Sequence, residues 1–552
     1  MNKSKQTLVM GWRENWKEII LFVLSMTFLL IMALYKLTET PLWLDECLEY
    51  YIGRTMTGVI PWYSNNGVTT AANMYERMLG GFQPPLYNFL SYFWLLISDT
   101  EWWFRFSGVI MCAIGGIGIY KVVKKISNYS LGALSVICYS CVYEIMYYTQ
   151  ECGEYIMLVM FLPWLFLWYL KAMEEHSFRN MLCFVLFCVL TIYTQYGAAF
   201  IIAPTAVSIL IKVWMDGREH AAQRKKQLTW FISFSGTAVI LAALPLLFFF
   251  VLPQLANQTN VEANPEIWNF YNNNVFSDIV HMFLDVFRWN LIESFTRFYT
   301  ISLIAVIVLL LMSIFYCVKG TDGTLKHLLI CNVFTWFLYY VPTRAGLYGR
   351  GYFGFRYNIF FIPMWIITLF YLFYRLYQML DGIEGEKKRK LLKRVYQTGM
   401  LVMAAGYCIY GSHQILKHWE KADTRGCVQA WYAEKGYDAS TLVEPMQAPA
   451  FSYYYEHDEA YNSEYDARVH RLIAPIADNI YHDDIERQQY EGYKQEIQEI
   501  YGDNWPDTIY CFVGDIDNSP VSDVLKDAGY EPEEIYRTTA QLYRFDKIQQ
   551  EE

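Results

Sequence analysis

The stretch that decides the fold class is residues 18–35, EIILFVLSMTFLLIMALY, which is followed at 43–46 by WLDE. The first run is apolar and long enough to cross a bilayer as a helix. Basic residues precede it and no small-residue cleavage site follows it, so we expect an uncleaved first span and not a removed signal peptide. The same basic residues place residues 1–17 in the cytoplasm.

The rest of the chain repeats this apolar pattern. Of its 552 residues, 55% are hydrophobic and 18% are aromatic, which is typical of a multi-spanning membrane protein and excludes a secreted globule. Further apolar runs lie near residues 102–120, 131–148, 155–170, 181–193, 198–214, 228–252, 300–318, 328–341, 357–374 and 396–410. The pattern therefore predicts an α-helical membrane domain over residues 18–410 with roughly eleven spans.

Basic clusters fall after every second span, which assigns those loops to the cytoplasm. The segment Pro84 to Ile97 is apolar but too short to cross as a helix, and counting it as a span would reverse every later basic loop. We therefore predict a juxtamembrane or re-entrant helix there. External loops are then expected at 37–101, 253–298 and 342–356, with the carboxyl terminus outside.

The composition changes from about Gly411, where acidic residues begin to outnumber basic ones. Strand patterns at 441–444, 509–513 and 542–545 alternate with helix patterns at 467–476, 488–501 and 521–528. Residues 411–552 are therefore predicted to form a soluble extracytoplasmic α/β domain. It contains Cys427 and Cys511, which could pair in an oxidising compartment, although we expect free thiols.

Carboxylates stand beside the membrane at Asp45 and Glu46, in the first external loop. Such groups are costly near a bilayer unless water, a cation or a polar ligand meets them, so they indicate a functional site. The alternative is a solvated loop, or for Glu46 and Glu49 a solvated first helical turn whose dipole favours negative charge.

Several motifs occur in the order found in GT-C membrane glycosyltransferases. They are Asp45-Glu46 with Tyr50, Gln83-Pro84-Pro85-Leu86-Tyr87, Phe104-Arg105-Phe106-Ser107, Gln150-Glu151 with Tyr155, Thr194-Gln195-Tyr196 and Arg356-Tyr357. The chain resembles the branch of protein O-mannosyltransferases and lipid A aminoarabinose transferases, which is like glycosyltransferase family 39. The resemblance covers most of the membrane part and, more weakly, the outer domain.

The resemblance implies transfer of a sugar from a polyprenyl-phosphate carrier to a hydroxyl acceptor on the outer face, with inversion at the anomeric carbon. A lipid phosphate is already a good leaving group, so one base and a cationic phosphate cradle suffice, unlike the paired carboxylates of glycoside hydrolysis. Asp45 is the candidate base, and Glu46 would orient the acceptor or a metal.

Positive charge for the phosphate is expected from the loop that carries Arg344, Arg350 and Arg356, the last followed by Tyr357. An interfacial anchor is the alternative role for Arg356. Arg105 could bind phosphate or pair with Asp99 or Glu101.

The remaining candidate residues would line the substrate cavity. They are Tyr50, Gln83, Pro84, Pro85, Glu144, Gln150, Glu151, Tyr155 and Gln195. Related proteins often carry His or Lys where this chain has Gln83, a weak metal ligand, so a divalent metal is allowed but not required.

The expected partners are a polyprenyl-phosphate-linked sugar donor, membrane lipid and an acceptor that could be a protein, a wall polymer or another lipid. No nucleic acid is expected. We place the chain in a bacterial or archaeal plasma membrane. The alternative functions are a transporter or flippase of lipid-linked glycans, or a glycan polymerase or ligase of unrelated fold.

Overall fold

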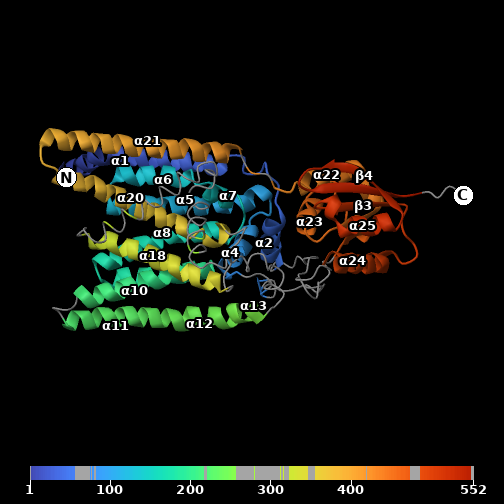
Figure 1. Ribbon diagram of the computed structural model, residues 1–552, viewed down its shortest axis with the longest axis horizontal. Coiled ribbons are helices and arrows are strands. Elements are labelled where there is room, and N and C mark those ends of the chain that lie inside the picture. Colours follow the sequence, from blue (N-terminus) through green and yellow to red (C-terminus); the bar gives the residue numbers. More distant parts are fainter. Residues whose placement is uncertain are drawn as a thin grey trace.

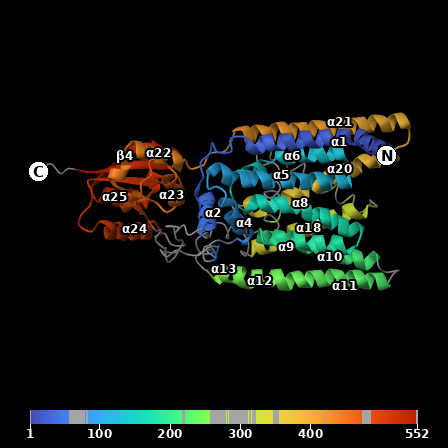
Figure 2. The same cartoon turned by 180° about the vertical axis from the view of Figure 1, so that it is seen from behind.

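In the computed structural model, a bundle of long helices carries a compact sheet domain at one end (Figure 1). The structure describes residues 2–55, 83–216, 221–256, 322–345, 355–417, 421–472 and 485–548, together with isolated positions that include Trp419. The predicted span at 300–318 and most of the predicted loop at 253–298 lie outside these residues. The view from behind shows the same separation of bundle and sheet domain (Figure 2).

Helices occupy the predicted apolar runs wherever the structure describes them. In the bundle and its loops they are α1 (Asn2–Leu34), α2 (Leu44–Thr55), α4 (Leu86–Leu95), α5 (Glu101–Ile126), α6 (Tyr129–Ser140), α7 (Tyr143–Thr149), α8 (Glu154–Glu174), α9 (Phe178–Ile192), α10 (Ala199–Asp216), α11 (Ala221–Ala238), α12 (Leu244–Leu246), α13 (Leu252–Ala256), α18 (Gly323–Arg344), α19 (Phe355–Asn358), α20 (Phe361–Met379) and α21 (Glu386–Lys417).

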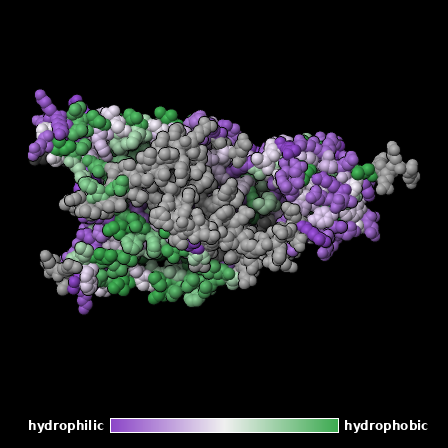
Figure 3. Space-filling view, in the orientation of Figure 1, coloured by the Kyte–Doolittle hydropathy of each residue, from purple (hydrophilic) through white to green (hydrophobic). Residues whose placement is uncertain are grey.

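Five of the described helices are long and apolar enough to cross a membrane, or six if α6 and α7, bent by 69°, count as one span. On the face seen in Figure 3, hydrophobic side chains gather on the coloured parts of the bundle, whereas the sheet domain and the far end of the bundle are mostly hydrophilic. This is the distribution expected of a protein embedded in lipid. The chain is therefore a multi-pass membrane protein.

The helix α4, predicted as a juxtamembrane segment, spans 10 residues. At 1.5 Å per residue it is about 15 Å long, half of the thickness of the hydrocarbon core. Pro85 precedes its first residue, and α4 packs against α2 at the end of the bundle next to the sheet domain (Figure 2).

The bundle core is built on close contacts of α5 with its neighbours. Gly108 of α5 lies against the carbonyl of Thr149, and Gly118 lies against Pro163 of α8. A side chain at either glycine would collide with these groups, so both contacts require glycine.

The carboxyl-terminal domain is a five-stranded sheet with helices on both faces. Its elements are α22 (Thr424–Ala433), β1 (Ser440–Val443), α23 (Ala448–Glu456), β2 (Val469–Arg471), α24 (Ile485–Tyr501), β3 (Thr508–Val513), α25 (Pro520–Asp527), β4 (Tyr530–Arg537) and β5 (Gln541–Lys547). The strand order is β2-β1-β3-β5-β4, with β2, β1 and β3 parallel and β5 antiparallel to both β3 and β4.

Two parts of the sequence prediction for this domain need revision. The helix predicted at 467–476 is wrong, because residues 469–471 form β2 and pair with β1. The predicted boundary at 411 falls inside α21, where Gly411 packs against the carbonyl of Cys141. Cys427 and Cys511 are buried free thiols, as expected.

Candidate functional site

The first candidate site is an ion pair at the end of the bundle that faces the sheet domain. Arg356 donates from Nη1 to Oδ2 of Asp45 at 2.8 Å, although 311 residues separate the two. Asp45 lies in the first turn of α2, where its charge favours the helix dipole. Its side chain is 37% exposed, so a ligand can reach it. The structure thus joins the residues predicted as base and phosphate cradle.

Buried polar atoms without hydrogen-bond partners occur in this pair and in two residues near it. Among the described residues they include Nε of Arg356, Oε2 of Glu154 and Oε1 of Gln195. Gln195 donates from Nε2 to the backbone carbonyl of Arg356 at 3.3 Å. The Glu154 carboxyl is close enough to Arg356 and Asp45 to interact electrostatically with both. An unpaired buried polar atom is costly, so a polar ligand would be stabilised here. We call Asp45, Glu154, Gln195 and Arg356 the Asp45 site.

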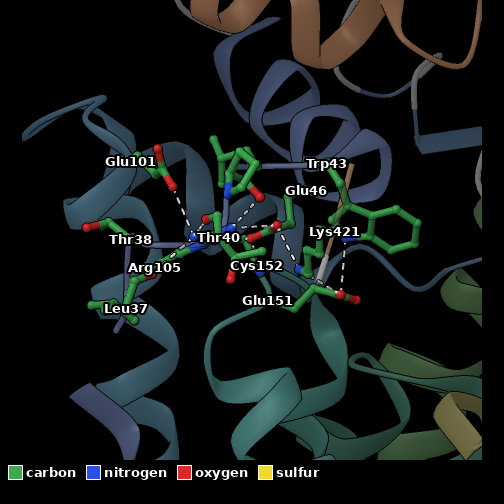
Figure 4. A network of polar contacts seen from close by, with 12 residues as sticks. Leu37, Thr38, Thr40, Trp43, Glu46, Glu101, Arg105, Glu151, Cys152 and Lys421 are labelled. Atoms are coloured by element: carbon green, nitrogen blue, oxygen red, sulfur yellow. Dashed lines mark hydrogen bonds and ion pairs between the residues drawn. The ribbon is translucent and has the colours of Figure 1, made fainter. Parts of the chain in front are cut away.

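Glu46, next to Asp45, is fully buried and belongs to a second network (Figure 4). Arg105 binds it through Nε at 2.9 Å and Nη2 at 2.8 Å, and the backbone amide of Cys152 donates to it at 3.3 Å. Lys421, from the start of the sheet domain, donates to Oε2 at 2.9 Å. The alternative of a solvated first turn is therefore wrong for Glu46.

Arg105 has no donor left for a phosphate. Besides Glu46 it binds Glu101 at 2.9 Å, the carbonyls of Leu37 and Pro41 at 3.0 Å each, and the carbonyl of Thr40 (Figure 4). Five N–H groups are engaged in six contacts, which is the forked geometry that arginine provides. The pairing with Glu101 that the sequence allowed is confirmed, and the geometry favours it over a phosphate-binding role.

Glu151 completes the network from the loop between α7 and α8. Its Oε2 accepts from Trp43 Nε1 at 3.1 Å and lies 3.0 Å from the Lys421 ammonium. Burial raises the pKa of Glu151. Burial would also raise the pKa of Glu46, but Arg105 and Lys421 outweigh it and hold that pKa below the usual value.

Glu49 lies behind the Asp45 site, one helical turn along α2. It is buried, which excludes the alternative of a solvated turn, and Asn88 of α4 donates to it. Burial, with the nearby charges of Glu154 and Asp45, raises its pKa well above the usual value. No motif singled out Glu49 as a site residue, because an acid in a short helix after WLDE is most simply a surface group.

Three other predicted site residues make contacts in different parts of the structure. Gln150 donates to the carbonyls of Ala33 and Tyr35 and so fixes the end of α1. Tyr50 packs edge-on against Tyr453 of the sheet domain, and Tyr155 packs against Tyr148.

The remaining predicted residues belong to the Pro-Pro segment, to α7 and to the predicted arginine loop. The carbonyl of Gln83 accepts from Gln254 at 2.9 Å, and Pro84 is buried before Pro85. Glu144 is buried in α7, Tyr357 lies under the Arg356 guanidinium at 5.2 Å, and Arg344 ends α18. Arg350 lies outside the described residues.

The described residues show no preformed cluster of protein ligands for a divalent metal. No group of three or more His, Cys, Asp or Glu side chains within them could hold an ion. Both oxygens of Glu46 are bound to protein cations, and Gln83 is a weak ligand.

Comparisons with known proteins identify the fold of the chain. Residues 83–253 match the family model described as dolichyl-phosphate-mannose-protein mannosyltransferase. ArnT from Cupriavidus metallidurans in the apo state is similar over 98% of both chains, with TM-score 0.55 and 11% identity. The same enzyme bound to undecaprenyl phosphate is similar over 97% of this chain and 98% of its own, with TM-score 0.52 and 11% identity. No curated protein matches by sequence. The chain therefore has the fold of the GT-C membrane glycosyltransferases.

Proposed function

We propose that this protein transfers a sugar from a polyprenyl-phosphate-linked donor to a hydroxyl acceptor, on the membrane face that carries the sheet domain. The observation that supports this most strongly is the pairing of an accessible carboxylate, Asp45, with an arginine whose Nε has no hydrogen-bond partner among the described residues. A lipid phosphate beside a reacting hydroxyl needs a base and a fixed cation. The ArnT structure bound to undecaprenyl phosphate supports a donor of this class.

In the proposed reaction, the carboxylate of Asp45 takes the proton of the acceptor hydroxyl as the hydroxyl oxygen bonds to the anomeric carbon. The bond from that carbon to the phosphate oxygen breaks, and the lipid phosphate leaves with the electron pair. Arg356 would stabilise the leaving phosphate through Nε while Nη1 holds Asp45 in place. Attack opposite to the leaving group inverts the anomeric configuration. No metal takes part in this scheme.

The unpaired oxygens of Glu154 and Gln195 suit the sugar. Both are acceptors, and sugar hydroxyls are donors, so a bound sugar would satisfy buried atoms that otherwise have no partner among the described residues. Glu46 and Arg105 have a supporting part in this proposal, because their charges are already bound to one another.

The orientation that we propose for the chain in the membrane is based on its basic residues. The helix α21 begins with a run of lysines and arginines at the end of the bundle away from the sheet domain (Figure 1). The positive-inside rule would place that end in the cytoplasm and the Asp45 site outside.

The test is sugar transfer by purified protein in lipid with a panel of radiolabelled polyprenyl-phosphate sugars, comparing the natural chain with Asp45→Asn. We expect turnover to fall by roughly 10²- to 10⁴-fold, the usual contribution of a general base. Asp99→Asn is the matched control, since Asp99 is 39% exposed and also lies near an arginine, Arg54 at 3.5 Å. Turnover in Asp45→Asn equal to that of the control would contradict the role of Asp45. Movement of the lipid-linked donor across vesicles without sugar transfer would favour a flippase.

A further inference from the structure

We infer that Lys421, at the start of the sheet domain, is a positioning residue that fixes the helix carrying Asp45. The expected effect of Lys421 on kcat rests on the proposed function. The expected effect on the hydrogen exchange of α2 rests on the structure alone. Lys421 is 3% exposed in its side chain, and its ammonium lies between Glu46 at 2.9 Å and Glu151 at 3.0 Å (Figure 4).

The surroundings of this ammonium define its position from several sides. Its Nζ lies 5.5 Å from the centre of the Trp43 ring and 5.1 Å from that of Tyr147, so two aromatic faces contact the cation. The Lys421 carbonyl accepts from Thr539 at 2.7 Å, which ties its backbone to the sheet domain. The lysine is therefore a rigid link between that domain and two membrane loops.

Neighbouring contacts hold the same loop. Arg425 donates to the carbonyls of Thr38 at 3.1 Å and Glu39 at 2.8 Å, and Thr40 donates to the carbonyl of Trp419 at 3.4 Å. We call Trp419, Lys421 and Arg425 the clamp. Among these three, Lys421 reaches α2 itself, through Glu46.

The clamp matters because Glu46 adjoins Asp45 in the first turn of α2. A shift of Glu46 moves Asp45 relative to Arg356, and a displacement of about 1 Å at a reacting group can lower a rate by roughly 10²-fold. Support of this kind for a reactive group is commonly what sets its precision. The sheet domain would then contribute to catalysis without touching the substrate.

The experiment compares three variants of the full chain in lipid: Lys421→Met, the double variant Lys421→Met/Glu151→Gln, and Lys526→Met. The last is an exposed lysine of the sheet domain, 3.5 Å from Asp523, and is the control. Hydrogen exchange of the peptide covering 44–55, thermal stability, kcat and the KM for the donor are measured for each.

For Lys421→Met we expect at least a tenfold faster hydrogen exchange in α2 and at least a tenfold lower kcat. The KM for the donor should change by less than about threefold, because an interaction lost only at the reacting centre lowers kcat. In the double variant the unpaired buried carboxylate is removed, so thermal stability should return while exchange and kcat remain impaired. Recovery of kcat in the double variant would show that Lys421 only balances charge, and would overturn the inference.

The two proposals fail in different ways. Absence of sugar transfer by the natural chain with every donor would contradict the proposed function, and the exchange measurement would then decide the inference by itself. Exchange of α2 in Lys421→Met equal to that in Lys526→Met would overturn it.

Discussion

Replacement of Arg105 by methionine is predicted to prevent the membrane domain from folding stably. The Arg105 side chain is 1% exposed and joins Glu46, Glu101 and three backbone carbonyls of the segment between α1 and α2. Breaking a buried ion pair by removing one partner costs about 3 to 5 kcal/mol. Each buried carbonyl left without a donor adds about 1 to 3 kcal/mol, although such costs are not fully additive. The sum approaches the whole stability of a typical domain, about 5 to 15 kcal/mol.

The assay is the yield of monodisperse protein after extraction, followed by thermal unfolding of the monodisperse fraction. We expect Arg105→Met to give little monodisperse protein, or a midpoint lowered by at least about 6 °C, at roughly 2 °C per kcal/mol for a large domain. Arg468→Met is the control, because Arg468 is 53% exposed and lies 3.8 Å from its acidic partner. A normal yield of Arg105→Met with a midpoint within about 2 °C of the control would refute this account of the network.

Three further changes test other parts of the fold. The pKa of Glu49 is raised in the folded chain, so the folded chain becomes less stable as pH rises above the pKa that Glu49 has when unfolded. Glutamine resembles the protonated carboxyl. Glu49→Gln should therefore raise the unfolding midpoint at about pH 8, and this gain should vanish near about pH 4. Gly108→Ala would place a methyl carbon 2.2 Å from the Thr149 carbonyl oxygen and should lower the free energy of unfolding by about 1 to 3 kcal/mol. The control is Gly399→Ala, whose methyl group meets nothing within 4 Å and should be neutral or slightly stabilising in the same thermal assay. Tyr454→Phe removes a hydroxyl that accepts from the backbone amide of Leu42 at 2.6 Å and donates to Glu101 at 3.0 Å, and should cost about 1 to 3 kcal/mol in the same thermal assay.

The helices were predictable because a bilayer demands apolar segments of a set length, and that demand is visible in a single sequence. The sheet domain was predictable only in part. Its central strands β1 and β3 are apolar runs, whereas β4, with the sequence YEPEEIYR, is an edge strand rich in glutamate that no hydrophobic pattern marks. The strand β2 is three residues long and exists through its pairing with β1.

For the candidate site, the sequence singled out Asp45, Arg356 and Gln195 but neither Glu154 nor the contacts between these residues. Asp45 and Arg356 were each singled out by chemistry, yet their contact across 311 residues is a product of the helix packing. Lys421 carried no signal at all, because a single lysine in a charged, soluble stretch resembles any surface residue. Glu46 was singled out for chemistry on substrate, and the structure favours a role in holding the loop.

The link between Glu46 and Lys421 also affects how the protein is made. The two residues are separated by 375 positions. At translation rates of about 5 to 20 residues per second, roughly 20 to 75 seconds pass between their synthesis. Throughout that interval Glu46 lacks one of its two cationic partners. A nascent or truncated chain that ends before the sheet domain would therefore lack the contact between Glu46 and Lys421. A quality-control protease that cleaves exposed segments could then distinguish such a chain from the full-length protein.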